Sequence, residues 1–198
     1  MATLIVNSAP GDARPIVDVI RAARPWGEIW VVDHYPREAL GDKFDRYWSV
    51  QDLTFARYAP DEVNRCPALD GAALADLAEI ESVFVKMLEK NEKFNKLNAA
   101  VRNNLVAWSY EGFPDLGHDY NARKANFIDH VRVWSHYIQH EVDEVVVSAI
   151  PNHGYDYVIY QLCQKFGKRF MTFDQLPIPG RLLPRMLMEL DRQQGAQP

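Results

Sequence analysis

The sequence is poor in cysteine, in basic surplus and in long apolar runs, and each shortage excludes a class of protein. Its two cysteines, Cys66 and Cys163, lie far apart and have neither metal-ligand spacing nor the density of a disulfide framework. Its 22 basic side chains are outnumbered by 27 acidic ones, for a formal net charge of −5, so there is no basic surplus to neutralise a nucleic-acid backbone. We therefore expect no nucleic-acid partner and a reducing, cytoplasmic location.

Signals for export or membrane insertion are also missing. The apolar run at residues 1–6 is too short, and has too little basic flank, for a signal peptide. No stretch approaches the roughly 20 apolar residues of a membrane span. One segment, Arg181 to Arg192, is a candidate for peripheral contact with a membrane surface.

Several motifs that would indicate a particular chemistry do not occur. The stretch Ser8 to Asp12 is neither the glycine fingerprint of dinucleotide-binding folds nor a P-loop, and there is no G-x-S-x-G elbow. His136 and His140 are one helical turn apart, but without an H-E-x-x-H pattern they are better interpreted as a solvated helix face than as a metal site. The sequence predicts no cofactor and no metal.

What the sequence does contain is the composition of a folded domain, with strand and helix patterns in alternation. Hydrophobic residues make up 47% and charged residues 25%, and 198 residues suit a single domain over 1–198. Because strands that alternate with helices form a mostly parallel sheet, we predict an α/β, Rossmann-like sheet of four or five strands with helices on both faces. The expected strands are Thr3 to Ser8, Glu28 to Tyr35, a short one near Tyr47 to Leu53, Glu144 to Ile150, and Arg169 to Phe173.

Helical patterns fill the long interval between the two β regions. Stretches at about 71–90, 92–110 and 120–140 make up a helical insertion, about 70–140, that could form a partly separate lobe. A further amphipathic helix begins after Gly154 and places Cys163 on its apolar stripe, which indicates a core residue. The aromatic residues between 44 and 58 could stack on a sugar ring, although core packing explains them as well.

The loop after the central valine-rich strand is the best candidate site, because ligands of open parallel sheets bind at the carboxyl ends of the strands. His153 could transfer a proton, and it lies just before a helix N-terminus that attracts anions. We predict Asn152, Gly154 and Asp156 as binding residues beside it. The alternative is that Asn152 caps the helix, His153 is an exposed loop residue and Asp156 interacts favourably with the helix dipole.

Other strand ends offer further candidates. Arg181 follows a stiff Pro-Ile-Pro-Gly turn, where a planar guanidinium would suit a phosphate or carboxylate, or would make an ordinary surface ion pair. Asp174, Asp33 and His34 end predicted strands and could accept hydrogen bonds from sugar hydroxyls. Each could instead cap a turn.

The stretch Val145 to Arg181, VVVSAIPNHGYDYVIYQLCQKFGKRFMTFDQLPIPGR, resembles a segment of bacterial capsular-polysaccharide-type glycosyltransferases and related surface-glycan proteins. In that family a strand runs into a loop with a proline and a histidine, then a helix with an Asp–Tyr pair, a second strand and a Pro-Gly-Arg turn. His153 and Arg181 match the histidine and the arginine, and Asp156 and Tyr157 match the pair. The resemblance covers the last quarter of the chain.

The resemblance implies an N-terminal, Rossmann-like half of a two-domain enzyme of the GT-B type, which mainly shapes the acceptor side. It implies His153 as the base or acceptor contact, Arg181 as an anion contact, and a sugar or nucleotide sugar as the ligand. The donor site would then lie in a second domain or subunit, unless the chain has lost transfer activity. The alternative is a non-catalytic module for sugar or nucleotide binding or for protein assembly.

Overall fold

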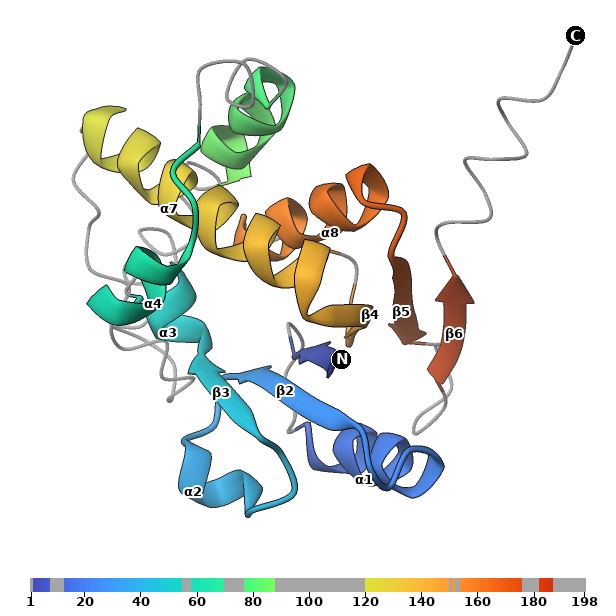
Figure 1. The fold of residues 1–198 in the computed structure, drawn as a ribbon. Helices are drawn as coiled ribbons and strands as arrows, with labels where there is room; N and C mark the ends of the chain where they lie inside the picture. Colours follow the sequence, from blue (N-terminus) through green and yellow to red (C-terminus); the bar gives the residue numbers. More distant parts are fainter. Residues whose placement is uncertain are drawn as a thin grey trace, which may run out of the picture.

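A computed structural model of the chain describes residues 2–7, 13–54, 58–69, 77–87, 120–149, 151, 154–175 and 182–186 (Figure 1). No helix in these ranges is long and apolar enough to cross a membrane. A helical segment covers residues 78–87. The other elements, in chain order, are β1 (Ala2–Val6), α1 (Arg14–Ala23), β2 (Glu28–Asp33), α2 (Arg37–Leu40), β3 (Arg46–Ser49), α3 (Val50–Thr54), α4 (Pro60–Arg65), α7 (Tyr120–His140), β4 (Val142–Val147), α8 (Tyr155–Lys165), β5 (Arg169–Gln175) and β6 (Leu182–Met186).

The strands form one sheet in the order β3-β2-β1-β4-β5-β6. The first five are parallel, and β6 pairs antiparallel with β5 at the edge. The apolar runs of β1, β2 and β4 are continuous rather than alternating, because parallel strands are covered on both faces. The predicted α/β, Rossmann-like class is confirmed.

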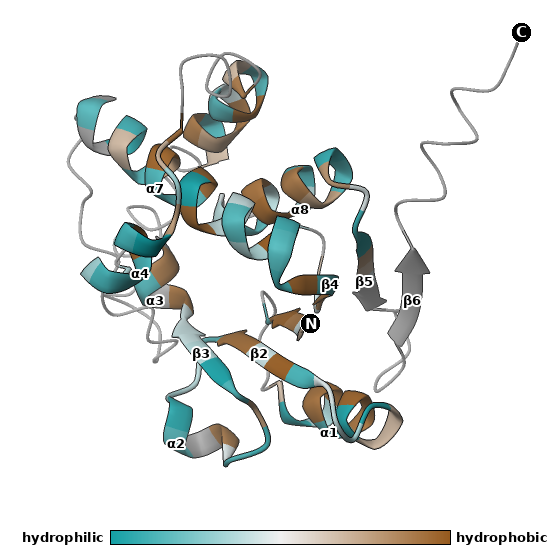
Figure 2. Ribbon diagram, in the orientation of Figure 1, coloured by the Kyte–Doolittle hydropathy of each residue, from teal (hydrophilic) through white to brown (hydrophobic). Residues whose placement is uncertain are grey.

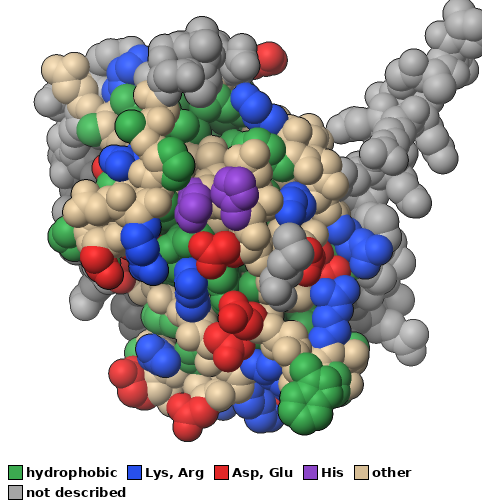
Figure 3. Space-filling view, in the orientation of Figure 1, with side chains coloured by type: hydrophobic (Ala, Val, Ile, Leu, Met, Phe, Trp, Pro, Cys, Tyr) green, Lys and Arg blue, Asp and Glu red, His purple; other side chains and the backbone are tan. Residues whose placement is uncertain are grey.

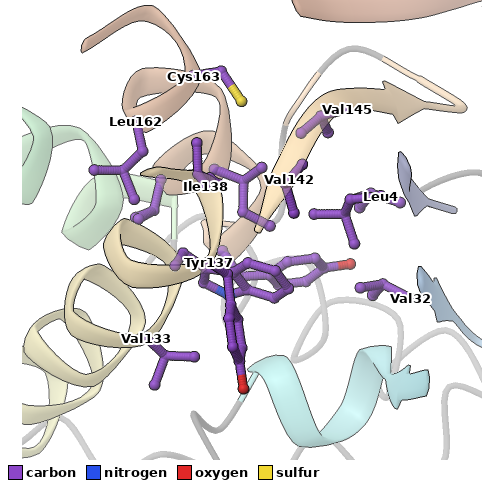
Figure 4. Packing of buried hydrophobic residues seen from close by; sticks show 14 of the residues in the cluster. Leu4, Val32, Val133, Tyr137, Ile138, Val142, Val145, Leu162 and Cys163 are labelled. Carbon is purple, nitrogen blue, oxygen red and sulfur yellow. The ribbon is translucent and has the colours of Figure 1, made fainter. Parts of the chain in front are cut away.

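Helices cover both faces of the sheet, as predicted, and successive strand residues point to opposite faces. On one face, Leu4 and Val145 belong to a large buried cluster with residues of α7 and α8 (Figure 4). On the other face, Ile5 and Val31 pack with Val17 of α1. The hydropathy colouring shows β1 and most of β2 in brown, and α7 and α8 as a mixture of brown and teal (Figure 2). The core is therefore a pair of layers on either side of β1 and β2.

Helix α7 lies over the sheet and contributes most to the larger layer. Its predicted apolar stripe is confirmed, since Phe127, Val131, Trp134 and Ile138 are all buried. Leu77 and Phe84 belong to the same buried cluster as residues of α7 and α8. The predicted helix at 92–110 lies outside the described residues.

Several elements differ from the expectation, and the short helices α2 and α4 were not predicted. The strand expected near Tyr47 to Leu53 ends at Ser49, because Ser49 Oγ accepts a hydrogen bond from Asp52 N at 2.9 Å and starts helix α3. Strand β6 was not expected, and it contains Pro184, a residue that sheets accept only at edges and bulges. An edge strand tolerates proline, and its pairing extends β5 beyond Phe173 to Gln175.

Candidate functional site at the carboxyl edge of the sheet

The sheet changes direction between β1 and β4. From β1 the chain passes through α1 to β2 on one side, and from β4 it passes through α8 to β5 on the other side. The smaller buried cluster holds α1 and the larger one holds α8, so the two connections leave the carboxyl edge toward opposite faces. This divergence is the topological switch point at which ligands bind in open α/β sheets.

A hydrogen-bonded chain of three side chains crosses the switch point. Ser148, just after β4, donates from Oγ to Oδ1 of Asn7, just after β1, at 2.8 Å. Asn7 in turn donates from Nδ2 to Oδ2 of Asp33, the last residue of β2, at 3.2 Å. Asn7 and Asp33 are buried, with 3% and 0% exposure, whereas Ser148 is half-buried. We call these residues the edge chain.

Asp33 ties two loops to the edge chain. Its Oδ2 also accepts a hydrogen bond from the backbone N–H of Ala13, the residue before α1, at 2.8 Å. Its Oδ1 accepts from the N–H of Tyr35 at 2.9 Å. Burial raises the pKa of Asp33 above its ordinary value of 3.8, against the opposing effect of these N–H donors. The sequence allowed two interpretations of Asp33, a ligand contact or a turn cap. In the structure its carboxylate makes the contacts of a turn cap.

Tyr47 of β3 fixes the same loop from the other side. Its hydroxyl lies 2.5 Å from the carbonyl oxygen of Tyr35 and 3.3 Å from that of Asp33. Burial, followed by the negative charges of Asp33 and Asp52, raises the pKa of Tyr47 to about 12. The phenol is therefore a neutral hydrogen-bond donor at physiological pH, and it holds the β2–α2 turn against the sheet.

The connection from β4 to α8 makes a sharp turn at Gly154. Gly154 has φ +86°, in the left-handed region that favours glycine, and it is the N-cap residue of α8 without a side-chain cap bond. Its carbonyl oxygen accepts a hydrogen bond from Val158 N at 3.0 Å. Asp156, in the first turn of α8, is fully buried rather than solvated, in a position that the helix dipole favours for a negative charge.

The structure describes some of the predicted site residues but not others. Gly154 and Asp156 lie together where α8 begins, at the carboxyl end of β4. Asn152, His153 and Arg181 lie outside the described residues. Asp174 does not end its strand: its backbone pairs with Leu183 inside the β5–β6 ladder, and its side chain is not described.

A buried histidine lies between α7 and the elements that follow β3. Tyr58 Oη is 2.5 Å from His130 Nδ1, and the His130 ring also has a hydrogen bond with the backbone of Leu53, in α3. Burial lowers the pKa of His130 to about 3, so the ring is neutral at physiological pH. The Tyr155 ring, at the start of α8, has its centroid 6.4 Å from that of His130. His130 is therefore a structural link behind the site.

The other histidines of α7 lie near its C-terminal end. The rings of His136 and His140 are 5.2 Å apart, and His136 Nε2 lies 3.6 Å from Glu141 Oε1. Figure 3 shows histidine side chains gathered on this face beside acidic ones. Within the part of the chain that the structure describes, no group of three or more histidine, cysteine, aspartate or glutamate side chains could hold a metal ion.

Sequence reasoning missed Ser148 as a site residue and placed Asn7 only within the loop after the first strand, although it named Asp33. The available signal was their position, because each is the first polar residue after a buried apolar run. Their hydrogen bond joins residues 141 positions apart. Only the strand order, with β1 between β2 and β4, brings the three side chains together.

Comparison with known proteins identifies no relative of the chain. No protein-family model, no curated protein and no solved structure matches the chain. The argument for function therefore starts from the geometry of the carboxyl edge.

Proposed function

We propose that this chain is the acceptor-side domain of a surface-polysaccharide glycosyltransferase and binds a sugar or nucleotide sugar at the carboxyl edge between β1 and β4. The observation that carries the proposal is the edge chain, a set of buried and half-buried polar side chains at the switch point of a parallel sheet. Hydroxyl-rich ligands require such groups, because orientation in a binding site comes from a few well-placed polar contacts. The resemblance of residues 145–181 supports the same class.

In the proposed reaction, His153 takes the proton of an acceptor hydroxyl. The acceptor oxygen then forms a bond to the anomeric carbon of the donor sugar, and the bond from that carbon to the leaving phosphate oxygen breaks. Arg181 contacts the phosphate. Asn152, Gly154, Asp156 and Asp174 contribute to the binding surface or to its shape, and a second domain or subunit supplies the main donor site.

Transfer and binding assays test this proposal. The chain would be titrated with UDP-, GDP- and CMP-linked sugars, and transfer to glycan acceptors would be measured for wild type and for His153→Ala. We expect the variant to lose about 10²-fold or more in turnover, as is typical when a general base is removed. The matched control is His140→Ala, an exposed histidine at the C-terminal end of α7, which should keep wild-type turnover.

Three other outcomes would each contradict a different part of the proposed function. Normal turnover by His153→Ala would remove this residue from the mechanism. Binding of nucleotide sugars without transfer would favour a non-catalytic binding module. Absence of any sugar or nucleotide binding would favour an assembly module and contradict the proposal.

A further inference from the structure

An exposed aromatic side chain lies at the carboxyl edge, just beyond β2. Of the large hydrophobic side chains that the structure describes, three are exposed: Val19, Trp26 and Tyr35. Val19 lies on α1, and Trp26 lies in the turn between α1 and β2, at the amino edge. Tyr35 is 44% exposed and follows the last residue of β2 by two positions. It therefore lies at the edge where the proposed ligand binds.

Core packing explains the aromatic residues that the sequence offered for stacking on a sugar, those between 44 and 58. The described ones pack in or against the two buried clusters: Phe44, Tyr47, Trp48 and Tyr58. Within the described part of the chain, Tyr35 belongs to neither cluster. The position of its ring at the edge therefore needs an explanation other than the core.

The backbone of Tyr35 is held on both sides of its side chain. Its N–H donates to Asp33 Oδ1 at 2.9 Å, and its carbonyl oxygen accepts from the Tyr47 hydroxyl at 2.5 Å. Pro36 comes next and restricts residue 35 to extended conformations. A tyrosine side chain has only two rotatable bonds, so little conformational freedom remains to be lost when a ligand binds. The loop therefore holds the ring as a preorganised contact surface.

We propose that Tyr35 is a stacking platform for a pyranose ring of the acceptor glycan. The inference rests on the proposed function and names the residue that recognises the sugar ring itself. The face of an aromatic ring is apolar and carries the negative part of its quadrupole. In a pyranose such as glucose, the hydroxyls are equatorial, so axial C–H bonds give each face of the ring an apolar and slightly positive surface. The two faces match in shape and in charge.

The strand spacing indicates which sugar residue of the acceptor lies on the platform. In the sheet, β1 separates β2 from β4, so Tyr35 lies two strands from the loop in which His153 is the proposed base. Two strand spacings are about 10 Å, which is comparable to the length of a disaccharide. Tyr35 therefore binds the sugar next to the one that reacts, and it contributes to acceptor affinity rather than to the chemical step.

The experiment measures disaccharide affinity by NMR titration of the full chain. The probes are maltose, cellobiose, lactose and diacetylchitobiose, with UDP-glucose and UDP as nucleotide probes. We expect Tyr35→Ala to weaken binding of the tightest disaccharide about tenfold, and Tyr35→Phe, which keeps the ring, to bind as wild type. The matched control is Trp26→Ala, which removes the exposed aromatic ring of the amino edge and should also bind as wild type.

Two features of the experiment separate stacking from an effect on the fold. Tyr35→Ala keeps the backbone N–H and carbonyl that contact Asp33 and Tyr47. The ring current of a stacked tyrosine also shifts the C–H protons of the bound sugar upfield. This shift should occur with wild type and Tyr35→Phe and should be absent with Tyr35→Ala. Binding of UDP should not depend on Tyr35.

The outcomes distinguish this inference from the proposed function. Wild-type disaccharide affinity in Tyr35→Ala, with transfer lost in His153→Ala, would overturn the platform and leave the proposed function standing. A loss of UDP affinity in Tyr35→Ala, without a loss of disaccharide affinity, would mean that the ring stacks on a nucleobase and would overturn the sugar assignment. An equal loss in Trp26→Ala would overturn the assignment to the carboxyl edge. Failure of every sugar and nucleotide probe to bind the wild-type chain would overturn the proposed function and this inference with it.

Discussion

The two edges of the sheet each bury a carboxylate, but they hold it with different partners. At the amino edge, Glu144 lies 2.6 Å from Arg24 Nη1 and 3.4 Å from Arg169 Nη1, and it accepts a hydrogen bond from Thr3 at 3.1 Å. At the carboxyl edge, Asp33 accepts from the backbone N–H groups of Ala13, His34 and Tyr35 and from the amide of Asn7, all of which are neutral. One carboxylate is paired with positive charge, and the other is held by dipoles.

The difference indicates what each edge is for. Two guanidinium groups and a hydroxyl join α1, β1, β4 and β5 around Glu144, an arrangement that fastens elements together. The polar groups of the carboxyl edge instead lead from a buried acid to a half-buried hydroxyl, and burial raises the pKa of that acid. Perturbed titratable groups and oriented dipoles occur often at binding sites, so the proposed function places recognition at the carboxyl edge and a structural role at the amino edge.

The largest expected effect is a loss of stability in acid that originates behind the carboxyl edge. Burial lowers the pKa of His130 from its ordinary 6.5 to about 3, so the unfolded chain binds a proton in this range that the folded chain does not. Stability should fall by about 1.4 kcal/mol per pH unit as pH drops from 6.5 toward 3. His130→Gln should remove this slope in urea unfolding at pH 7, 6, 5 and 4. His140→Gln is the control that should keep it, and equal slopes in both variants would contradict the assignment.

Removal of the Asp33 side chain should have the next largest effect. Asp33→Ala leaves the N–H groups of Ala13 and Tyr35 and the amide of Asn7 without their acceptor, and we expect a cost of about 3 kcal/mol. Asp18→Ala, which breaks an exposed pair with Lys43, should cost less than about 1 kcal/mol. Denaturant titration measures both. A cost for Asp33→Ala as small as the control's would mean that the edge chain does not hold the two loops.

A substitution at the amino edge should cost less stability than one at Asp33, and it should not change ligand binding. Glu144→Gln keeps the hydrogen bond from Thr3 but weakens two ion pairs whose arginines are 43% and 56% exposed, so we expect a cost of about 1 kcal/mol. Sugar binding should be unchanged. A loss of sugar affinity in Glu144→Gln, measured beside Tyr35→Ala, would break the division between the two edges.

The smallest effect is the pH dependence that Asp33 itself contributes. Because its pKa is raised in the folded protein, the folded chain binds the proton more tightly than the unfolded chain, whose Asp33 titrates near 3.8. This stabilising contribution is present below pH 3.8 and is lost as pH rises through the folded pKa. Asp33→Asn in the His130→Gln background should lack it. If the contribution of Asp33 to folding stability increased as pH rises, the result would contradict a raised pKa in the folded protein.

The sequence predicts the sheet well because local patterns determine its strands. Continuous apolar runs mark β1, β2 and β4, and the valines of β4 favour a strand wherever it is placed. Strand β6 was not predicted, and it contains a proline, Pro184, that only an edge position in the sheet makes acceptable. Local composition therefore predicts the elements, while their tertiary neighbours decide the exceptions.

The site was less accessible to sequence reasoning. Its loop and helix start were expected at Gly154 and Asp156, since a strand end and a helix N-terminus are local features. The contacts of Asn7 with Ser148 and Asp33 depend on strand order, which short-range patterns do not specify. The burial of Asp33 likewise follows from the packing of α1 and β3 around β2.

Backbone-amide chemical shifts during titration with UDP-glucose and maltose test the central claim most directly. If the carboxyl edge is the binding site, the amides of Asn7, Ser148 and Gly154 should move with a common affinity. Those of Glu28, Val142 and Arg169, at the start of their strands, should stay in place. Shifts confined to the amino edge, or spread evenly over both edges, would contradict the account.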